Sequence, residues 1–169
     1  MPLSGPGRAV AVAAGLVLAA GVCLLRRRLA VVAVIGPSMQ PTLVAGDRVL
    51  ARRVGPGDVR AGQIVVIEKP GDDGAWPAGH RPARPREWMI KRVAAVPGDP
   101  RPAFMPVRAG GGSGGATLVV PAGQLVVLGD NPARSLDSRQ LGYIPADRVL
   151  GVVTRSMRRA GTRPPDGSG

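Results

Sequence analysis

The stretch Trp88-Met89-Ile90-Lys91-Arg92-Val93-Ala94-Ala95-Val96 decides how this chain folds and where its chemistry lies. It is apolar apart from two adjacent basic residues, a pattern typical of a β-strand. Since successive side chains of a strand point to opposite faces, we expect Lys91 and Arg92 on opposite sides, one of them toward the apolar side. A lysine removed from water loses pKa and can accept a proton at neutral pH. The alternative is a solvated lysine on an edge strand.

Similar short runs occur along the rest of the chain. The run Asp47 to Val54 alternates apolar and polar residues, as a half-buried strand does. The 25 glycines and 18 prolines favour short strands and many turns. We therefore predict a mainly antiparallel β domain, with a hairpin joining 117–120 to 124–128. The other predicted strands are 29–35, 63–68, 88–96 and 148–154.

The N-terminal stretch Ala9 to Leu25 carries no charge. At about 1.5 Å per residue it would span roughly 25 Å as a helix, slightly less than the ~30 Å hydrocarbon core. Flanking arginines could reach the interface and close that gap. A cleaved signal peptide is the alternative, but Arg26-Arg27-Arg28 directly after the run argues against cleavage there. We predict a single uncleaved transmembrane helix.

This prediction divides the chain into three parts. Residues 1–28 would form the tail and membrane anchor, 29–157 the folded domain, and 158–169 a disordered tail. Loops at 70–87 and 100–116 are rich in Pro, Gly and Arg. Three arginines follow the anchor and only Arg8 precedes it, so the positive-inside tendency places the domain in the cytoplasm. The function considered below favours the opposite side of the cell membrane, and the orientation stays open.

The net charge of +12 comes from 23 basic and 11 acidic residues. An anionic membrane surface or nucleic acid could balance it, but aromatic residues for base stacking make up only 2% of the chain. We expect membrane lipid as a partner and no nucleic acid. Cys23 is the single cysteine, which excludes an intramolecular disulfide. No His, Asp or Glu cluster has metal-ligand spacing, so we expect no metal and no cofactor.

A serine lies in the run Val34-Ile35-Gly36-Pro37-Ser38-Met39-Gln40-Pro41-Thr42-Leu43. Pro37 and Pro41 bracket it and restrict the backbone, which could present the hydroxyl rigidly. A simple turn between strands is the alternative. The single histidine, His80, lies in a Pro- and Arg-rich loop, where a base would lack fixed geometry.

A third segment, Leu128 to Arg139, combines small and charged residues. Such a density of small polar residues usually indicates a turn. Asp137 and Arg139 could form an ion pair there, and Ser135 could hydrogen-bond a nearby amine. These groups could orient a buried lysine.

Together these segments resemble the type I signal peptidases, which are membrane-anchored serine–lysine peptidases. The Ser38 run resembles the family's nucleophile motif Ser-Met-x-Pro-Thr-Leu, and Lys91 to Asp99 resembles its general-base block. Gly46 to Val49 and Gly129 to Arg139 resemble two further blocks. The four blocks occur in the family's order, and the resemblance covers residues 9 to about 153.

The resemblance implies a signal-peptidase-like fold and a role for each residue. Ser38 would attack the scissile carbonyl, Lys91 would take its proton, and the Ser38 N–H would stabilise the oxyanion. Ser135 would orient the lysine amine. Three charged residues would support the site and three residues would line the substrate pocket: Asp130, Asp137 and Arg139, and Ile35, Gly36 and Met39. Precursor proteins with signal or leader peptides would bind as an added β-strand and be cut after small residues.

The chain departs from the family pattern at two positions. Gly36 stands where some relatives carry a serine that donates to the oxyanion, and Ala95 stands where the family usually has glycine. The small size of the catalytic domain and the charges around the anchor raise one alternative function, a peptidase dedicated to one precursor and facing the cytoplasm. A self-cleaving regulator would need a DNA-binding domain that the N-terminus does not offer. A non-catalytic, membrane-tethered β module that binds an anionic partner is an alternative of another class.

Overall fold

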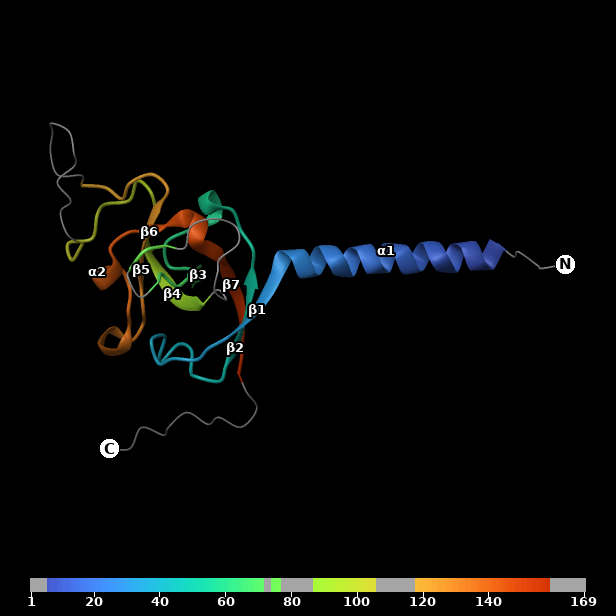
Figure 1. The fold of residues 1–169 in the computed structure, drawn as a ribbon, viewed down its shortest axis with the longest axis horizontal. Helices are drawn as coiled ribbons and strands as arrows, with labels where there is room; N and C mark the ends of the chain where they lie inside the picture. Colours follow the sequence, from blue (N-terminus) through green and yellow to red (C-terminus); the bar gives the residue numbers. More distant parts are fainter. Residues whose placement is uncertain (1–5, 72–73, 77–86, 106–117, 159–169) are drawn as a thin grey trace.

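The computed structural model describes residues 6–71, 74–76, 87–105 and 118–158 of the chain. A β domain follows a long N-terminal helix (Figure 1). His80, parts of the loops at 70–87 and 100–116, and all but one residue of the tail at 158–169 lie outside these ranges.

Seven strands form one antiparallel sheet, as the mainly β prediction requires. In space their order is β1-β2-β7-β3-β4-β5-β6. The long last strand pairs with β2 on one side and with β3 on the other. The strands are β1 (Leu29–Ala33), β2 (Arg48–Arg52), β3 (Ile64–Glu68), β4 (Trp88–Ala95), β5 (Gln124–Leu128), β6 (Ile144–Pro145) and β7 (Val149–Met157).

The sheet is covered on both faces by apolar side chains. In the central strand β3, Val65 and Ile67 pack into one cluster while Val66 packs into another, because neighbouring residues face opposite sides. The second cluster includes Met39 and Leu43, which follow Ser38 in the chain. The core therefore fixes the serine segment directly to one face of the sheet.

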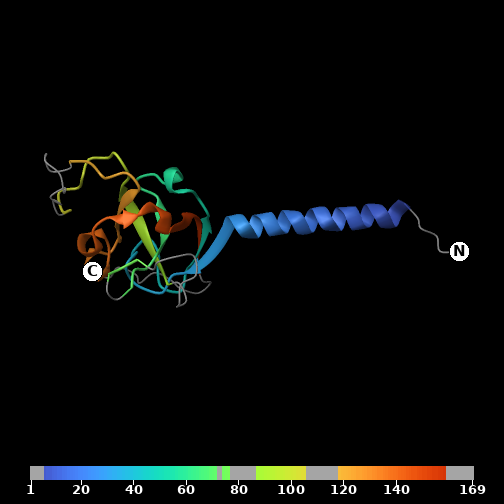
Figure 2. The same ribbon diagram turned by 45° about the horizontal axis from the view of Figure 1, so that its top comes forward.

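Helix α1 spans Pro6–Arg28 and runs straight into β1. It extends away from the β domain in both ribbon views (Figures 1 and 2). The helix lies where the membrane anchor was predicted. However, none of the helices in the described part of the chain combines the length and apolarity that crossing a membrane requires. The prediction of a transmembrane helix is thus unsupported.

The predicted hairpin between 117–120 and 124–128 is wrong. Val119 makes only an isolated bridge to Pro100, while β5 pairs with β4 and with the short strand β6. Gly123 turns the chain with a positive φ of 70°, but its backbone oxygen accepts a hydrogen bond from Ala146 rather than closing a hairpin. The sequence analysis also missed β6 and four short helical turns: η1 (Pro56–Asp58), η2 (Pro132–Arg134), α2 (Ser138–Leu141) and η3 (Ala146–Arg148).

Candidate active site

Ser38 lies in a turn that follows β1 and is held at both ends. Before it, the Val34 N–H donates to the Asp47 carbonyl at 2.9 Å, and the Val34 carbonyl accepts from Gly46 at 2.8 Å. After it, Met39 is buried and its carbonyl accepts a hydrogen bond from Leu43. The serine itself stays partly exposed between these anchors. A partly exposed hydroxyl on a fixed backbone can meet a substrate in a defined orientation.

Lys91 lies in the middle of β4 and is 3% exposed. Its Nζ is hydrogen bonded to the Ser38 Oγ, and the two atoms are 3.0 Å apart. Burial lowers the pKa of the lysine below its usual value; the positive charge of Arg139 lowers it further, while the negative charge of Asp137 raises it. The expected alternation also holds, because Arg92 is half-exposed while Lys91 is buried. The amine is thus placed and desolvated as a base for this serine would be.

Asp137 forms the N-cap of α2 and is fully buried. Its carboxylate accepts from the Gly129 N–H at 2.9 Å and from the Arg139 side chain at 2.9 and 2.6 Å. Although burial opposes ionisation, the hydrogen bonds from Arg139 and Gly129 lower its pKa to about 2. The predicted pair of Asp137 and Arg139 therefore exists, and it keeps the Asp137 carboxylate ionised near Lys91.

Ser135 lies beside the site because the chain packs very closely around Gly129. Its side chain lies against Gly129, where an added Cβ would come within 2.6 Å of both the Ser135 Cβ and the Ser38 carbonyl oxygen. The Ser135 Oγ lies close enough to Asp137 to help lower the pKa of that carboxyl. It nevertheless makes no well-formed hydrogen bond to any of the described residues. No bond from Ser135 to the Lys91 amine is seen in that part of the chain, so the orienting role stays a prediction.

A second ion pair joins the segment after β5 to strand β4. Asp130 accepts from the Arg92 side chain at 2.9 and 2.7 Å. The hydrogen bond from Arg92 lowers the pKa of Asp130, burial opposes this, and a hydrogen bond from Thr42 lowers it further. In addition, the Asn131 N–H donates to the Ser38 carbonyl at 2.9 Å. Three of the four segments that resemble family blocks, those of Ser38, Lys91 and Gly129, are thus bonded to one another around Ser38.

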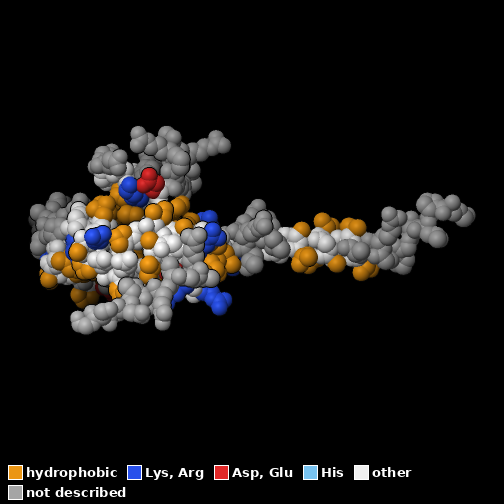
Figure 3. Space-filling view, turned by 90° about the horizontal axis from the view of Figure 1, so that it is seen from below, with side chains coloured by type: hydrophobic (Ala, Val, Ile, Leu, Met, Phe, Trp, Pro, Cys, Tyr) orange, Lys and Arg blue, Asp and Glu red, His pale blue; other side chains and the backbone are white. Residues whose placement is uncertain are grey.

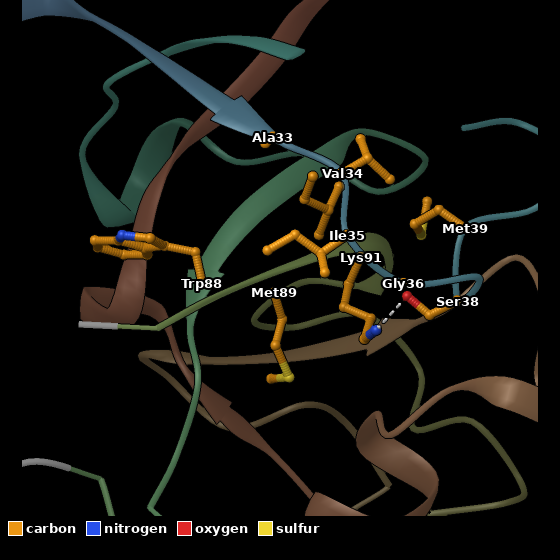
Figure 4. A pocket seen from close by; sticks show the side chains of 10 residues that line it. Ala33, Val34, Ile35, Gly36, Ser38, Met39, Trp88, Met89 and Lys91 are labelled. Carbon is orange, nitrogen blue, oxygen red and sulfur yellow. Dashed lines mark hydrogen bonds between the residues drawn. The ribbon is translucent and has the colours of Figure 1, made fainter. Parts of the chain in front are cut away.

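A pocket of about 190 Å³ opens beside the serine and the lysine (Figure 4). The three residues predicted to contact substrate all line it: Ile35, Gly36 and Met39. An added Cβ at Gly36 would meet nothing within 4 Å, so this wall is open. The remaining lining residues come from the end of β1 and the start of β4, and are Ala33, Val34, Trp88, Met89 and Ile90. The walls are mostly aliphatic, with Ser38 and Lys91 at one end.

Sequence reasoning missed several residues that hold this site together. Arg92 and Thr42 bind Asp130, and the buried Ser138 Oγ accepts from the Val127 N–H at 2.9 Å. All three stand inside or directly beside the quoted motifs. Their polar side chains were a usable signal, but only the fold shows which partners they meet.

The comparison with known protein families agrees with this geometry. The profile of the family described as "Signal peptidase, peptidase S26" matches residues 7–100 and 103–157. This match includes Ser38, Lys91 and the whole segment from Gly129 to Arg139.

Individual relatives point the same way. The chain is 35% identical over 122 residues to mitochondrial ATP-independent inner membrane protease subunit 1b of Arabidopsis thaliana, covering 70% of this chain and 63% of that protein. It is 32% identical to mitochondrial inner membrane protease subunit 1 of Schizosaccharomyces pombe, covering 70% and 66%. It is 31% identical to signal peptidase I T of Bacillus subtilis, covering 69% and 67%. The chain thus spans slightly less than two thirds of the first two relatives, and it belongs to the signal peptidase family, peptidase S26.

Proposed function

We propose that this chain is a serine endopeptidase that removes N-terminal signal or leader peptides from precursor proteins. The observation that carries the proposal is the 3.0 Å hydrogen bond between Lys91 Nζ and Ser38 Oγ at the end of the pocket. A serine needs an adjacent base to become a nucleophile, and a buried lysine with a lowered pKa is such a base.

The reaction begins with attack of the Ser38 Oγ on the scissile carbonyl carbon, while the neutral Lys91 amine takes the hydroxyl proton. The Ser38 N–H stabilises the oxyanion. This N–H is available for that role because it donates to no backbone carbonyl of the described residues. As the peptide bond breaks, Lys91 gives its proton to the departing amine. The Lys91 amine, neutral again, then takes a proton from the water that hydrolyses the acyl-enzyme.

The supporting residues act on the lysine rather than on the substrate. The carboxylate of Asp137 stabilises the ammonium that forms during the reaction, while Arg139 holds that carboxylate in place. Ser135, whose side chain lies against Gly129, orients the amine. Arg92 of β4 binds Asp130, which also binds Thr42 and so ties the serine segment to β4.

The shape of the pocket favours small residues at the −1 and −3 positions of the substrate. Its volume of about 190 Å³ is below that of typical small-molecule sites. An extended peptide can lie along the segment Ala33 to Gly36 and place alternate side chains between Ile35 and Met39.

We also propose that the protein works at a membrane. Two relatives are named as inner membrane proteases. The described apolar side chains of α1 are strongly exposed, among them Leu16, Val17 and Leu18 at 67%, 74% and 71%. Their contact with lipid would remove a large apolar surface from water.

The test is cleavage of a precursor that ends in a small-x-small motif. Ser38→Ala and Lys91→Ala should each abolish cleavage, and a serine-reactive probe should label the wild type at Ser38. Two residues outside the pocket supply matched controls, since Ser156→Ala and Lys69→Ala remove the same chemical groups from an exposed and a half-exposed position. Cleavage retained by either active-site variant would contradict the proposal. Absence of labelling would favour a non-catalytic binding module.

A further inference from the structure

Arginines gather on the outer face of the sheet edge formed by β1, β2 and the end of β7. Residues that pair across antiparallel strands project to the same face. Val31, Leu50 and Arg155 form one such row, and Ala33, Arg48 and Met157 form the next. Arg52 lies two residues beyond Leu50 in β2 and therefore shares this face. Arg48, Arg52 and Arg155, called here the arginine face, project together.

The arginine face is exposed and lacks counter-charges. All three side chains are exposed, and within the described ranges none of them lies within 4 Å of a carboxylate oxygen. The rows contain no acidic residue. Apolar groups are exposed between the arginines, with Val31 at 58% and Met157 at 39%. Such a mixture of unpaired cations and exposed aliphatic groups calls for an anionic, partly apolar partner.

The position of the arginine face points to a lipid surface. Strand β1 continues directly from α1, and two more exposed arginines meet at that junction, where the Arg53 N–H donates to the Arg28 carbonyl at 2.8 Å. Figure 3 shows basic side chains on the end of the β domain from which the helix departs. An apolar helix beside a cluster of cations matches the two layers of a membrane interface. The two rows hold no aromatic residue on which nucleic-acid bases could stack.

We propose that the arginine face binds the headgroups of anionic phospholipids and lays the edge of the β domain against the membrane. The inference rests on the membrane attachment proposed above, but not on the serine–lysine chemistry. Ala33 belongs to a row of this face and also lines the substrate pocket. Lipid binding therefore holds the pocket close to the headgroup layer, where a precursor's leader leaves the membrane.

The test measures partition of the purified full chain into vesicles of phosphatidylcholine, with and without phosphatidylglycerol. The readout is the ratio of the two partition coefficients, which cancels the contribution of α1 to both. At about 1 kcal/mol per arginine, the double variant Arg48→Gln/Arg155→Gln should lower this ratio roughly thirtyfold. The control Arg60→Gln/Lys69→Gln removes the same charge from one exposed and one half-exposed position outside the arginine face, and should lower the ratio less than about threefold. Unchanged thermal midpoints show that both variants fold.

Each other outcome overturns the inference. An unchanged ratio in the arginine variant means that the face does not bind lipid. An equal fall in both variants means that net charge alone is responsible. Tighter binding to a DNA duplex than to anionic vesicles at the same salt, lost in the arginine variant, would assign the face to nucleic acid. Cleavage of a short soluble peptide tests the proposed function separately, because it needs no membrane.

Discussion

Lys91 and Asp137 are both buried in the same site, but the protein surrounds them differently. Among the residues that the structure describes, the lysine amine has one hydrogen-bond partner, the Ser38 hydroxyl. The Asp137 carboxylate accepts from the backbone of Gly129 and Arg139 and twice from the Arg139 guanidinium. With few partners, burial lowers the pKa of the lysine and favours the neutral amine; with many donors, the pKa of the aspartate falls to about 2. One group is prepared to exchange a proton, and the other is kept charged.

The largest effect should come from Lys91→Met, which replaces the sparsely bonded amine by an apolar chain of similar length. Cleavage should fall at least about 10⁴-fold because the serine loses its base. The free energy of unfolding at pH 7 should rise by about 1 kcal/mol because a desolvated amine is removed. Chemical denaturation measures the second effect. The control Lys69→Met, at a half-exposed lysine that pairs with Glu87, should change neither cleavage nor stability by much. A strongly destabilised Lys91→Met would contradict a lysine with few stabilising partners.

Gly129→Ala should break the close packing behind the pair. The new Cβ would lie 2.6 Å from the Ser38 carbonyl oxygen and from the Ser135 Cβ, so the serine segment must shift. We expect a loss of about 1–3 kcal/mol in stability and roughly 100-fold in kcat/KM. Gly57→Ala is the control, since its Cβ would meet nothing within 4 Å. Wild-type activity in Gly129→Ala would show that the close packing of Gly129 against Ser38 and Ser135 does not position Ser38.

Acid stability tests the other half of the comparison. The folded pKa of Asp137, about 2, lies below the usual 3.8, so the unfolded chain binds more protons between these values. The resulting stabilisation, roughly 2 kcal/mol, is complete above about pH 4 and is lost as the pH falls toward 2. Asp137→Asn should remove this part of the pH dependence in denaturation curves. Asp58→Asn, at an exposed turn, should keep it, and equal acid profiles for the wild type and Asp137→Asn would contradict the assignment.

The smallest effect is expected from Arg139→Gln, because Arg139 acts on both Lys91 and Asp137. The positive charge of Arg139 lowers the pKa of Lys91, and its removal also leaves Asp137 less neutralised. Both changes raise the pKa of Lys91, so the rise of kcat/KM with pH should move to higher pH. We expect a loss of roughly three- to tenfold at pH 7 that is recovered at higher pH. Arg60→Gln is the control, and a loss that is the same at every pH would indicate damage to the structure instead.

The strands were predictable wherever short apolar runs lie between Gly and Pro turns. The runs that became β3 and β4 are examples, since burial on one or both faces leaves a clear pattern. The hairpin at 117–128 failed because local turn residues do not reveal which strand is the partner; β5 pairs with β4, whose first residue lies 36 positions earlier. The short strand β6 has only two residues, too few for any periodicity.

The residues of the site likewise fall into those that could be predicted from the sequence and those that could not. Ser38, Lys91 and the pair of Asp137 and Arg139 could be predicted because their residue types and motifs carry the chemistry. The link from Arg92 through Asp130 to Thr42 could not, because it joins three segments that are far apart in the chain. The arginine face depends on strand register in the same way, since Arg48 and Arg155 lie on one surface only after β2 and β7 pair.

The central claim, that Lys91 is a neutral base for Ser38, is tested most directly by the pH dependence of kcat/KM for a short precursor peptide, measured together with the titration of the Lys91 amine by NMR. We predict that kcat/KM rises with pH to a plateau, that the rise follows the titration of Lys91, and that both midpoints lie below the usual lysine value of 10.5. A Lys91 pKa at or above that value, or a rate profile that does not follow it, would contradict the account.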